Sequence, residues 1–164
     1  MELQVVIEEG VKEFNLKDFR GFILTVFPFI REIQTTHGII LCKQCWIAKR
    51  NQYNAECLLD YVLRLKDNNI VAFFISQDTY IRDLNYVFGI GASNIGAVIS
   101  TYRFKNDISN FQKVVLHELG HIFGLDHCLP PCPMASSNNI LDLYPLNGSY
   151  CQSCQKELRA FEFK

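Results

Sequence analysis

Apolar residues recur along the chain in patterns that predict alternating strands and helices. The run Leu3–Glu8 is rich in β-branched residues and predicts an opening strand. Apolar positions three to four residues apart predict a helix from Asn15 to about Thr35, with a kink at Pro28. Residues 39–41 predict a short strand, and Asn54 can cap a helix that follows it.

The same alternation continues in the second half of the chain. Residues 70–75 are a continuous apolar run, as expected of a strand buried on both faces. Residues 97–102 alternate like a strand with one solvated face, and residues 108–123 have the period of a helix. A short helix is expected at about 155–161. The pattern predicts an α/β fold with a mixed, mostly parallel twisted sheet and helices.

The composition changes after Gly124. Four of the five prolines and four of the seven cysteines lie beyond this residue, and the apolar periodicity nearly disappears. We therefore expect one domain over residues 1–164 with two unequal parts. Residues 1–124 form an α/β half, and residues 125–164 form a small irregular half held by something other than an apolar core.

Composition and charge exclude several classes of function. The 164 residues are 49% hydrophobic and 20% charged, which is typical of a folded domain. A net charge of −1 provides no basic excess for nucleic acid or an anionic membrane. The N-terminus lacks the positive region of a secretory signal, and no apolar stretch is long enough to span a bilayer. We expect a cytoplasmic monomer.

Three of the four histidines lie in the segment HELGHIFGLDH, from His117 to His127. His117 and His121 share one face of the predicted helix, so both can reach one zinc ion, with Glu118 beside it. Gly124 can take the positive φ that ends the helix and returns His127 to the same ion. Three nitrogens leave one coordination position open, as in a catalytic site. The alternative is that these are surface or core histidines with satisfied hydrogen bonds.

The cysteines form a second constellation. Two close pairs, Cys128 with Cys132 and Cys151 with Cys154, have the spacing of a closed, structural four-thiolate zinc site. The alternative is unliganded buried thiols.

Three further cysteines lie upstream, at Cys42, Cys45 and Cys57. Cys42 and Cys45 are a weaker pair, in which a redox pair or a competing ligand pair is possible. Core thiols are the preferred interpretation for this pair, and for Cys57 as well.

The segment HELGHIFGLDHC, the following Cys132-Pro133-Met134 and the CQSC pair together resemble the archaemetzincins, a branch of the metzincin zinc metallopeptidases. The resemblance covers roughly residues 45–155 and includes Arg50–Ala55, Asn85–Gly89 and Ser100–Arg103. Two loops between the motif residues are each one residue shorter than in the family pattern.

This resemblance implies a metzincin-like fold and roles for particular residues. It implies that Glu118 is the general base and that Met134 lies in the turn beneath the metal; alone, Met134 would be read as a core methionine. Two zinc ions are implied. The ligands of the catalytic ion would be His117, His121 and His127. Those of the structural ion would be Cys128, Cys132, Cys151 and Cys154.

The expected function is hydrolysis of a peptide or protein substrate by a zinc-activated water. Metzincin-like enzymes bind substrate beside an edge strand, so the candidate strand is 97–101, with Ala97, Val98 and Ile99 as substrate-binding residues. An edge strand that pairs with nothing is the alternative. The alternative function is a zinc-containing peptide-binding or regulatory protein with little or no turnover.

Overall fold

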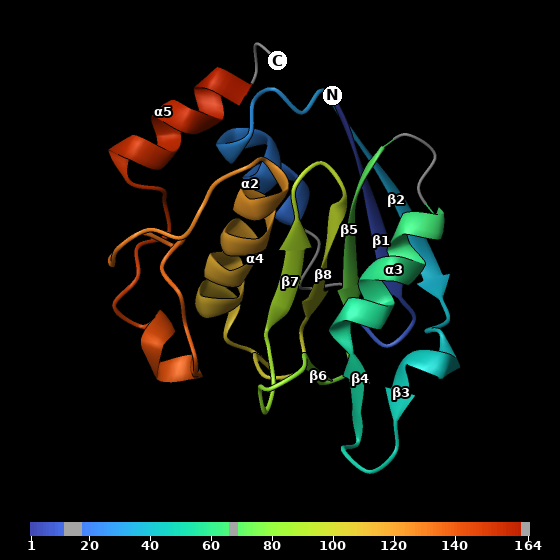
Figure 1. Cartoon of the computed structure of the whole chain (residues 1–164). Coiled ribbons are helices and arrows are strands. Elements are labelled where there is room, and N and C mark those ends of the chain that lie inside the picture. The colour runs from blue at the N-terminus through green and yellow to red at the C-terminus, as the bar shows by residue number, and fades with distance from the viewer. Residues whose placement is uncertain (12–17, 66–68, 162–164) are drawn as a thin grey trace.

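The computed structural model describes residues 1–11, 18–65 and 69–161, and its centre is a five-stranded sheet between helices (Figure 1). The sheet contains β1 (Glu2–Glu8), β2 (Glu32–Ile39), β5 (Ile70–Ile75), β7 (Gly89–Ala92) and β8 (Gly96–Ser100), in the order β2-β1-β5-β8-β7. All neighbours are parallel except β7, which runs antiparallel to β8. The mixed, mostly parallel sheet is thus confirmed.

A second, smaller sheet lies at the end of the first. It consists of β3 (Trp46–Ile47), β4 (Gln52–Asn54) and β6 (Thr79–Tyr80), and the short helix η1 (Lys43–Cys45) precedes it. In chain order, η1, β3 and β4 connect β2 to the next helix, and β6 follows β5.

Alternate residues of the main strands point to opposite faces of the sheet and contribute to two apolar layers. On β5, Val71 and Phe73 pack with the side of α3 (Ala55–Leu65), whereas Ala72 and Phe74 pack with α2 (Phe19–Val26) and α4 (Ile108–Ile122). All of β5 is buried, as its continuous apolar run predicts. Asn54 caps α3 by accepting a hydrogen bond from the Cys57 amide, which confirms that prediction.

The long helix predicted from Asn15 to Thr35 is wrong. Residues 15–17 lie outside the described residues, and α2 ends at Val26, just before Pro28. The chain then enters β2 at Glu32, which pairs in parallel with β1. Proline lacks the amide hydrogen that would continue the helix, and the free edge of β1 offers the following residues a ladder of backbone hydrogen bonds.

The prediction of an edge strand at 97–101 is also wrong. β8 lies between β5 and β7, and Ala97, Val98 and Ile99 are fully buried. Both backbone edges of β8 are occupied by neighbouring strands, so these residues cannot pair with a peptide. The edge strand on this side is β7. It has no apolar strand pattern because two of its residues are glycines.

The C-terminal part contains η2 (Ile140–Leu143) and α5 (Gln152–Phe161). Its buried side chains, among them Leu143, Tyr150 and Leu158, join the same apolar cluster as α2 and α4. The expectation that this part lacks an apolar core is therefore wrong. Its apolar residues are scattered through irregular backbone, so they have neither the helix nor the strand period in the sequence. No helix among the described residues has the length and hydropathy to cross a membrane.

Candidate metal centre

α4 and the turn after it bring three histidines together. His117 and His121 lie one turn apart on α4, and their Nε2 atoms are 3.1 Å apart. The ligand atoms of His117, His121 and His127 lie within 4.8 Å of one another. Zinc–nitrogen bonds of about 2.0–2.1 Å in a tetrahedron place two nitrogens about 3.4 Å apart. The three rings therefore fit one zinc ion.

The opposite ring nitrogens set the tautomer of two of these histidines. Nδ1 of His117 is 2.8 Å from the Pro133 carbonyl oxygen, and Nδ1 of His121 is 2.9 Å from that of Leu125. A carbonyl only accepts, so each Nδ1 carries the proton and each Nε2 keeps its lone pair. Two lone pairs facing each other are unfavourable without a cation between them, and their arrangement supports a metal site.

The return of His127 depends on the end of α4. Gly124 has φ +81°, and the Gly124 amide donates to the His121 carbonyl while the Leu125 amide donates to the Gly120 carbonyl. These two bonds are the Schellman ending of a helix, for which glycine is the favoured residue. The reversal also places the Leu125 carbonyl against the ring of His121.

Glu118 lies beside the histidines, enclosed by α4 and β7. Its exposed fraction is 6%, and a Cβ on Gly89 would lie 2.8 Å from the Glu118 Cγ. Burial raises the pKa of Glu118 to about 8. A cation in the adjacent histidine site lowers this pKa, because the opposite charge favours the carboxylate.

His117 and His121 are held neutral. Burial lowers the pKa of His117 to about 4, and the nearby His121 and His127 lower it further, although the Pro133 carbonyl opposes them. Burial is also the main cause that lowers the pKa of His121. Neutral imidazole is the form that binds a metal, so little proton competition is expected at pH 7.

Met134 packs directly beneath α4. A Cβ on Gly120 would overlap the Met134 sulfur, so only glycine permits this approach. The Met134 carbonyl accepts from the Cys128 amide, and the preceding Pro133 carbonyl faces His117. The turn at Met134 therefore links the histidine site to the cysteine site.

Four cysteines form the second group. Their sulfurs lie within 4.8 Å of one another, with 3.6 Å from Cys128 to Cys151 and 3.8 Å from Cys132 to Cys154. Zinc–sulfur bonds of about 2.3 Å in a tetrahedron place sulfurs about 3.8 Å apart. The amide of Cys154 lowers the pKa of Cys151 to about 7, which favours a thiolate there, whereas burial raises the pKa of Cys154 and the hydrogen bond with Cys151 raises that of Cys128. The set fits a closed, structural zinc.

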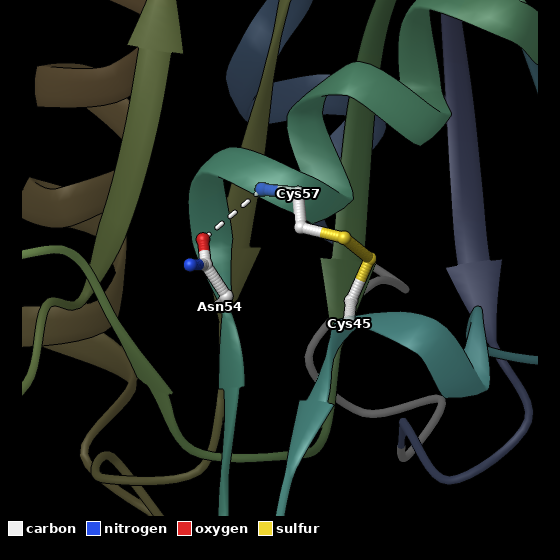
Figure 2. Close-up of a disulfide and its surroundings, with 3 residues drawn as sticks. All are labelled: Cys45, Asn54 and Cys57. Atoms are coloured by element: carbon white, nitrogen blue, oxygen red, sulfur yellow. Dashed lines mark hydrogen bonds between the residues drawn. A yellow bond between two sulfur atoms is a disulfide. The ribbon is translucent and has the colours of Figure 1, made fainter.

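Cys45 and Cys57 form a disulfide (Figure 2). Cys42 is a free cysteine. The preferred interpretation of Cys45 and Cys57 as core thiols is thus wrong. The bridge ties η1 to the first turn of α3, twelve residues apart in the chain. A pair separated by twelve residues has no spacing signal that distinguishes it from separate core thiols.

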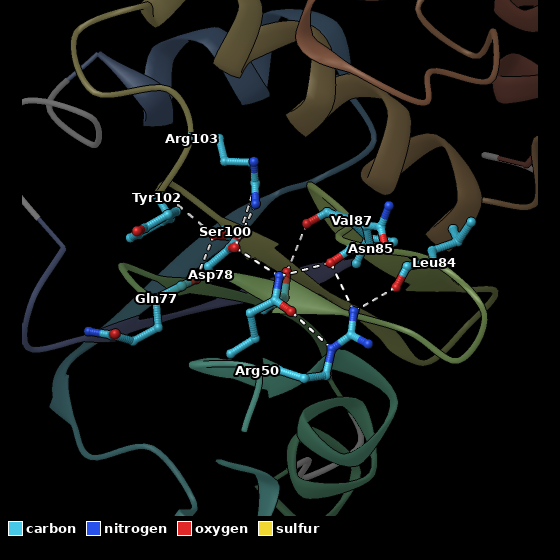
Figure 3. Close-up of polar contacts among 11 residues, drawn as sticks. Arg50, Gln77, Asp78, Leu84, Asn85, Val87, Ser100, Tyr102 and Arg103 are labelled. Atoms are coloured by element: carbon cyan, nitrogen blue, oxygen red, sulfur yellow. Dashed lines mark hydrogen bonds and ion pairs between the residues drawn. The ribbon is translucent and has the colours of Figure 1, made fainter. Parts of the chain in front are cut away.

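A polar network places the segment that leads into β7 (Figure 3). The buried Asp78 carboxylate accepts from Arg103 through Nε at 2.9 Å and Nη2 at 2.7 Å, and from Gln52 Nε2 at 2.8 Å. Arg50 donates to the carbonyls of Leu84 and Asn85. No role for these residues was predicted from the sequence. Arg50, Asn85 and Arg103 nevertheless lie in three of the segments that carry the resemblance, and this could have marked them.

A cleft of about 500 Å³ opens onto the histidine site. The segment from Leu84 to Gly89 lines this cleft, together with Pro133, Ser137 and Leu143. The side chains of His117, His127 and Glu118 lie along it. A cleft with an open metal position and a carboxyl group can bring a water and a carbonyl compound together.

The chain is similar to known proteins in sequence and in structure. Residues 39–160 match the family model of peptidase family M54. The chain is 40% identical over 109 residues to an archaemetzincin of Nanoarchaeum equitans, covering 66% of this chain and 64% of that protein. It is 32% identical over 124 residues to an archaemetzincin of Archaeoglobus fulgidus, covering 71% and 74%.

The fold is also similar to a solved structure. The crystal structure of an archaemetzincin from Methanopyrus kandleri superposes with a TM-score of 0.87 at 27% identity, covering 100% of this chain and 96% of that one. The sequence match to the Nanoarchaeum equitans protein spans just under two thirds of that relative's length.

Proposed function

The chain belongs to peptidase family M54, the archaemetzincins, and on this basis we propose that it is a zinc-dependent peptidase acting in the cleft beside His117. The observation that carries the proposal is the convergence of three histidine nitrogens within 4.8 Å, with Glu118 in the same cleft. Such a site has an open coordination position, which a structural site does not need.

His117, His121 and His127 would hold the catalytic zinc, and the four cysteines a second, structural zinc. When bound, zinc supplies a polarised scissile carbonyl and an acidified water. The carbonyls of Pro133 and Leu125 orient the imidazoles of His117 and His121, and burial keeps these two rings neutral.

Glu118 would act as the general base. Its carboxylate accepts the proton of the attacking water and delivers it to the amine that leaves. Its enclosure by Gly89 on β7 fixes the carboxyl group in position and excludes bulk solvent from it. Glu118 follows His117 directly on α4, so it projects about 100° away around the axis and is not placed as a further ligand.

The free edge of β7 is the place for an extended peptide. β7 pairs with β8 on one side only, and Gly89 at its beginning lines the cleft. A peptide added there would form main-chain hydrogen bonds with the sheet and present its bond to the histidine site. The role expected for residues 97–101 thus passes to β7.

The test is a digest of a peptide library by the zinc-loaded protein, with Glu118→Gln as the matched control. Glutamine keeps the size and polarity of the side chain but does not accept the proton. We expect cleavage by the unsubstituted protein, and loss of at least about a hundredfold in rate in Glu118→Gln with the zinc content unchanged. Binding without cleavage in both proteins would favour the alternative, a peptide-binding protein without turnover.

A further inference from the structure

A buried lysine lies in the cleft, one helical turn before His117. Lys113 has an exposed fraction of 8%, although lysine is seldom buried in proteins. His117 follows it by four positions on α4, so both side chains lie on one face about 6 Å apart along the axis. Both line the same cleft.

The Lys113 ammonium has only neutral partners. Nζ donates to Asn110 Oδ1 at 3.0 Å, to the Leu143 carbonyl at 2.9 Å and to the Tyr144 carbonyl at 3.5 Å. The third bond is at the limit of hydrogen-bond length, so that N–H is the one most easily given to a ligand. Leu143 itself lines the cleft, which places the ammonium at its wall.

No carboxylate of the described residues forms an ion pair with this ammonium, although Asn110 links it to Asp107. The one ion pair they form joins Arg103 to Asp78. Asp107 is engaged by Asn110, and Asp142 by the amides of Asn138 and Asn139. A buried cation without a counterion is costly, so a site that keeps one has a use for negative charge.

A second polar group that lines the cleft lacks a hydrogen-bond partner. Ser137 Oγ is the one buried side-chain oxygen or nitrogen of the described residues without a hydrogen bond. Ser137 lines the cleft together with Lys113. Buried hydroxyls are normally bonded, so this oxygen is available to a ligand that enters the cleft.

We propose that Lys113 and Ser137 form a subsite for a carboxylate of the bound peptide. The proposal rests on the proposed peptidase function and adds a substrate class to it. The carboxylate is either an Asp or Glu side chain next to the scissile bond or the C-terminus of a short peptide. Among the described lining residues of the cleft, Glu118 is the one acidic side chain, and it lies beside the histidines.

The experiment compares peptides that differ by one charge. Zinc-loaded Glu118→Gln protein, in which turnover is blocked, is titrated calorimetrically with acetyl-Ala-Ala-X-Ala-Ala-amide, where X is Glu or Gln. A third peptide has X as Gln and a free C-terminal carboxylate. We expect one of the two carboxylate peptides to bind about tenfold or more tightly than the neutral peptide, and which one does so identifies the source.

Lys113→Met in the same background tests the assignment to this residue. Methionine keeps the length and the packing of the stem and removes the charge, so the preference for the carboxylate should be lost. An equal fall in affinity for charged and neutral peptides would instead show a purely structural role. Lys156→Met, on the exposed face of α5, is the charge-matched control and should keep the preference. If Lys113→Met does not fold, Ser137→Ala should still reduce the preference.

The outcomes separate this inference from the peptidase function. Equal binding of all three peptides by folded, zinc-loaded protein would overturn the carboxylate subsite even if neutral peptides are cleaved. Selective binding of a carboxylate peptide that the unsubstituted protein never cleaves would retain the subsite and overturn the peptidase function.

Discussion

Glu118 is a single carboxyl group whose ionisation is linked to the stability of the metal-free protein. Burial raises its pKa from 4.5 to about 8. Between these values the unfolded chain binds fewer protons at this group than the folded one, so its contribution to stability is lost as pH rises. Glu118→Gln does not titrate. We expect its Tm in chelator to match that of the unsubstituted protein below about pH 4.5 and to exceed it increasingly up to about pH 8.

The comparison isolates one group, because His117 and His121 are present in both proteins and titrate in both. The measurement is thermal unfolding at a series of pH values with chelator present. A Tm difference that stays constant with pH would mean that Glu118 is ionised and solvated in the folded protein, contrary to its enclosure by β7.

At the scale of elements, the segment between β6 and β7 depends on Asp78. This carboxylate accepts three hydrogen bonds from Arg103 and Gln52, and Arg103 also stacks 3.5 Å above the ring of Tyr86. Asp78→Asn keeps the shape but leaves the guanidinium without its counter-charge. We expect the free energy of unfolding to fall by about 2 kcal/mol.

Urea denaturation measures this loss. Arg82→Gln, at an exposed position of the same segment, is the control and should change stability by less than about 0.5 kcal/mol. If the two variants behave alike, the network of Asp78 does not hold this segment. In a folded Asp78→Asn protein, we also expect weaker peptide binding, because the segment leads directly into the edge strand.

Elements with a strong local pattern could be predicted from the sequence, and those decided by neighbours could not. α4 and β5 carry a complete apolar period, and their residues are buried as expected. β2 is different. Six of the seven residues from Glu32 to Gly38 are exposed, so the strand has no apolar pattern. It forms because β1 offers a free edge for backbone pairing. β7 contains two glycines in four residues, so nothing in its composition marks it as a strand.

The same distinction applies to the site. The spacing of His117, His121 and His127 predicts a shared ion, because helix period and one glycine turn determine their geometry. Lys113 and Asp78 carry no such signal. Lys113 matters because η2 covers it, and its bond to the Leu143 carbonyl joins residues thirty positions apart.

The whole molecule combines two apolar clusters, one on each face of the sheet, with a disulfide and a group of four cysteines that would form a second cross-link around a zinc ion. The cysteine site holds the C-terminal part against α4, where Tyr150 also donates to the Leu116 carbonyl at 2.5 Å. The disulfide lies on the opposite side, between η1 and α3. Sequence spacing indicated the metal site because zinc ligands come in close pairs. It did not indicate the disulfide, whose partners meet only when α3 packs on the sheet.

These two cross-links should respond differently to substitution. We expect two zinc ions in the fully loaded protein, one in Cys151→Ser and two in Cys45→Ala/Cys57→Ala, as measured by elemental analysis. The double variant should lose about 2–3 kcal/mol of unfolding free energy, the amount expected for a short closed loop. Cys151→Ser should expose the segment after Gly124 to limited proteolysis, since the remaining thiolates cannot close the site. Loss of a zinc ion in the double variant would mean that Cys45 or Cys57 is a ligand and that the cysteines are partitioned differently.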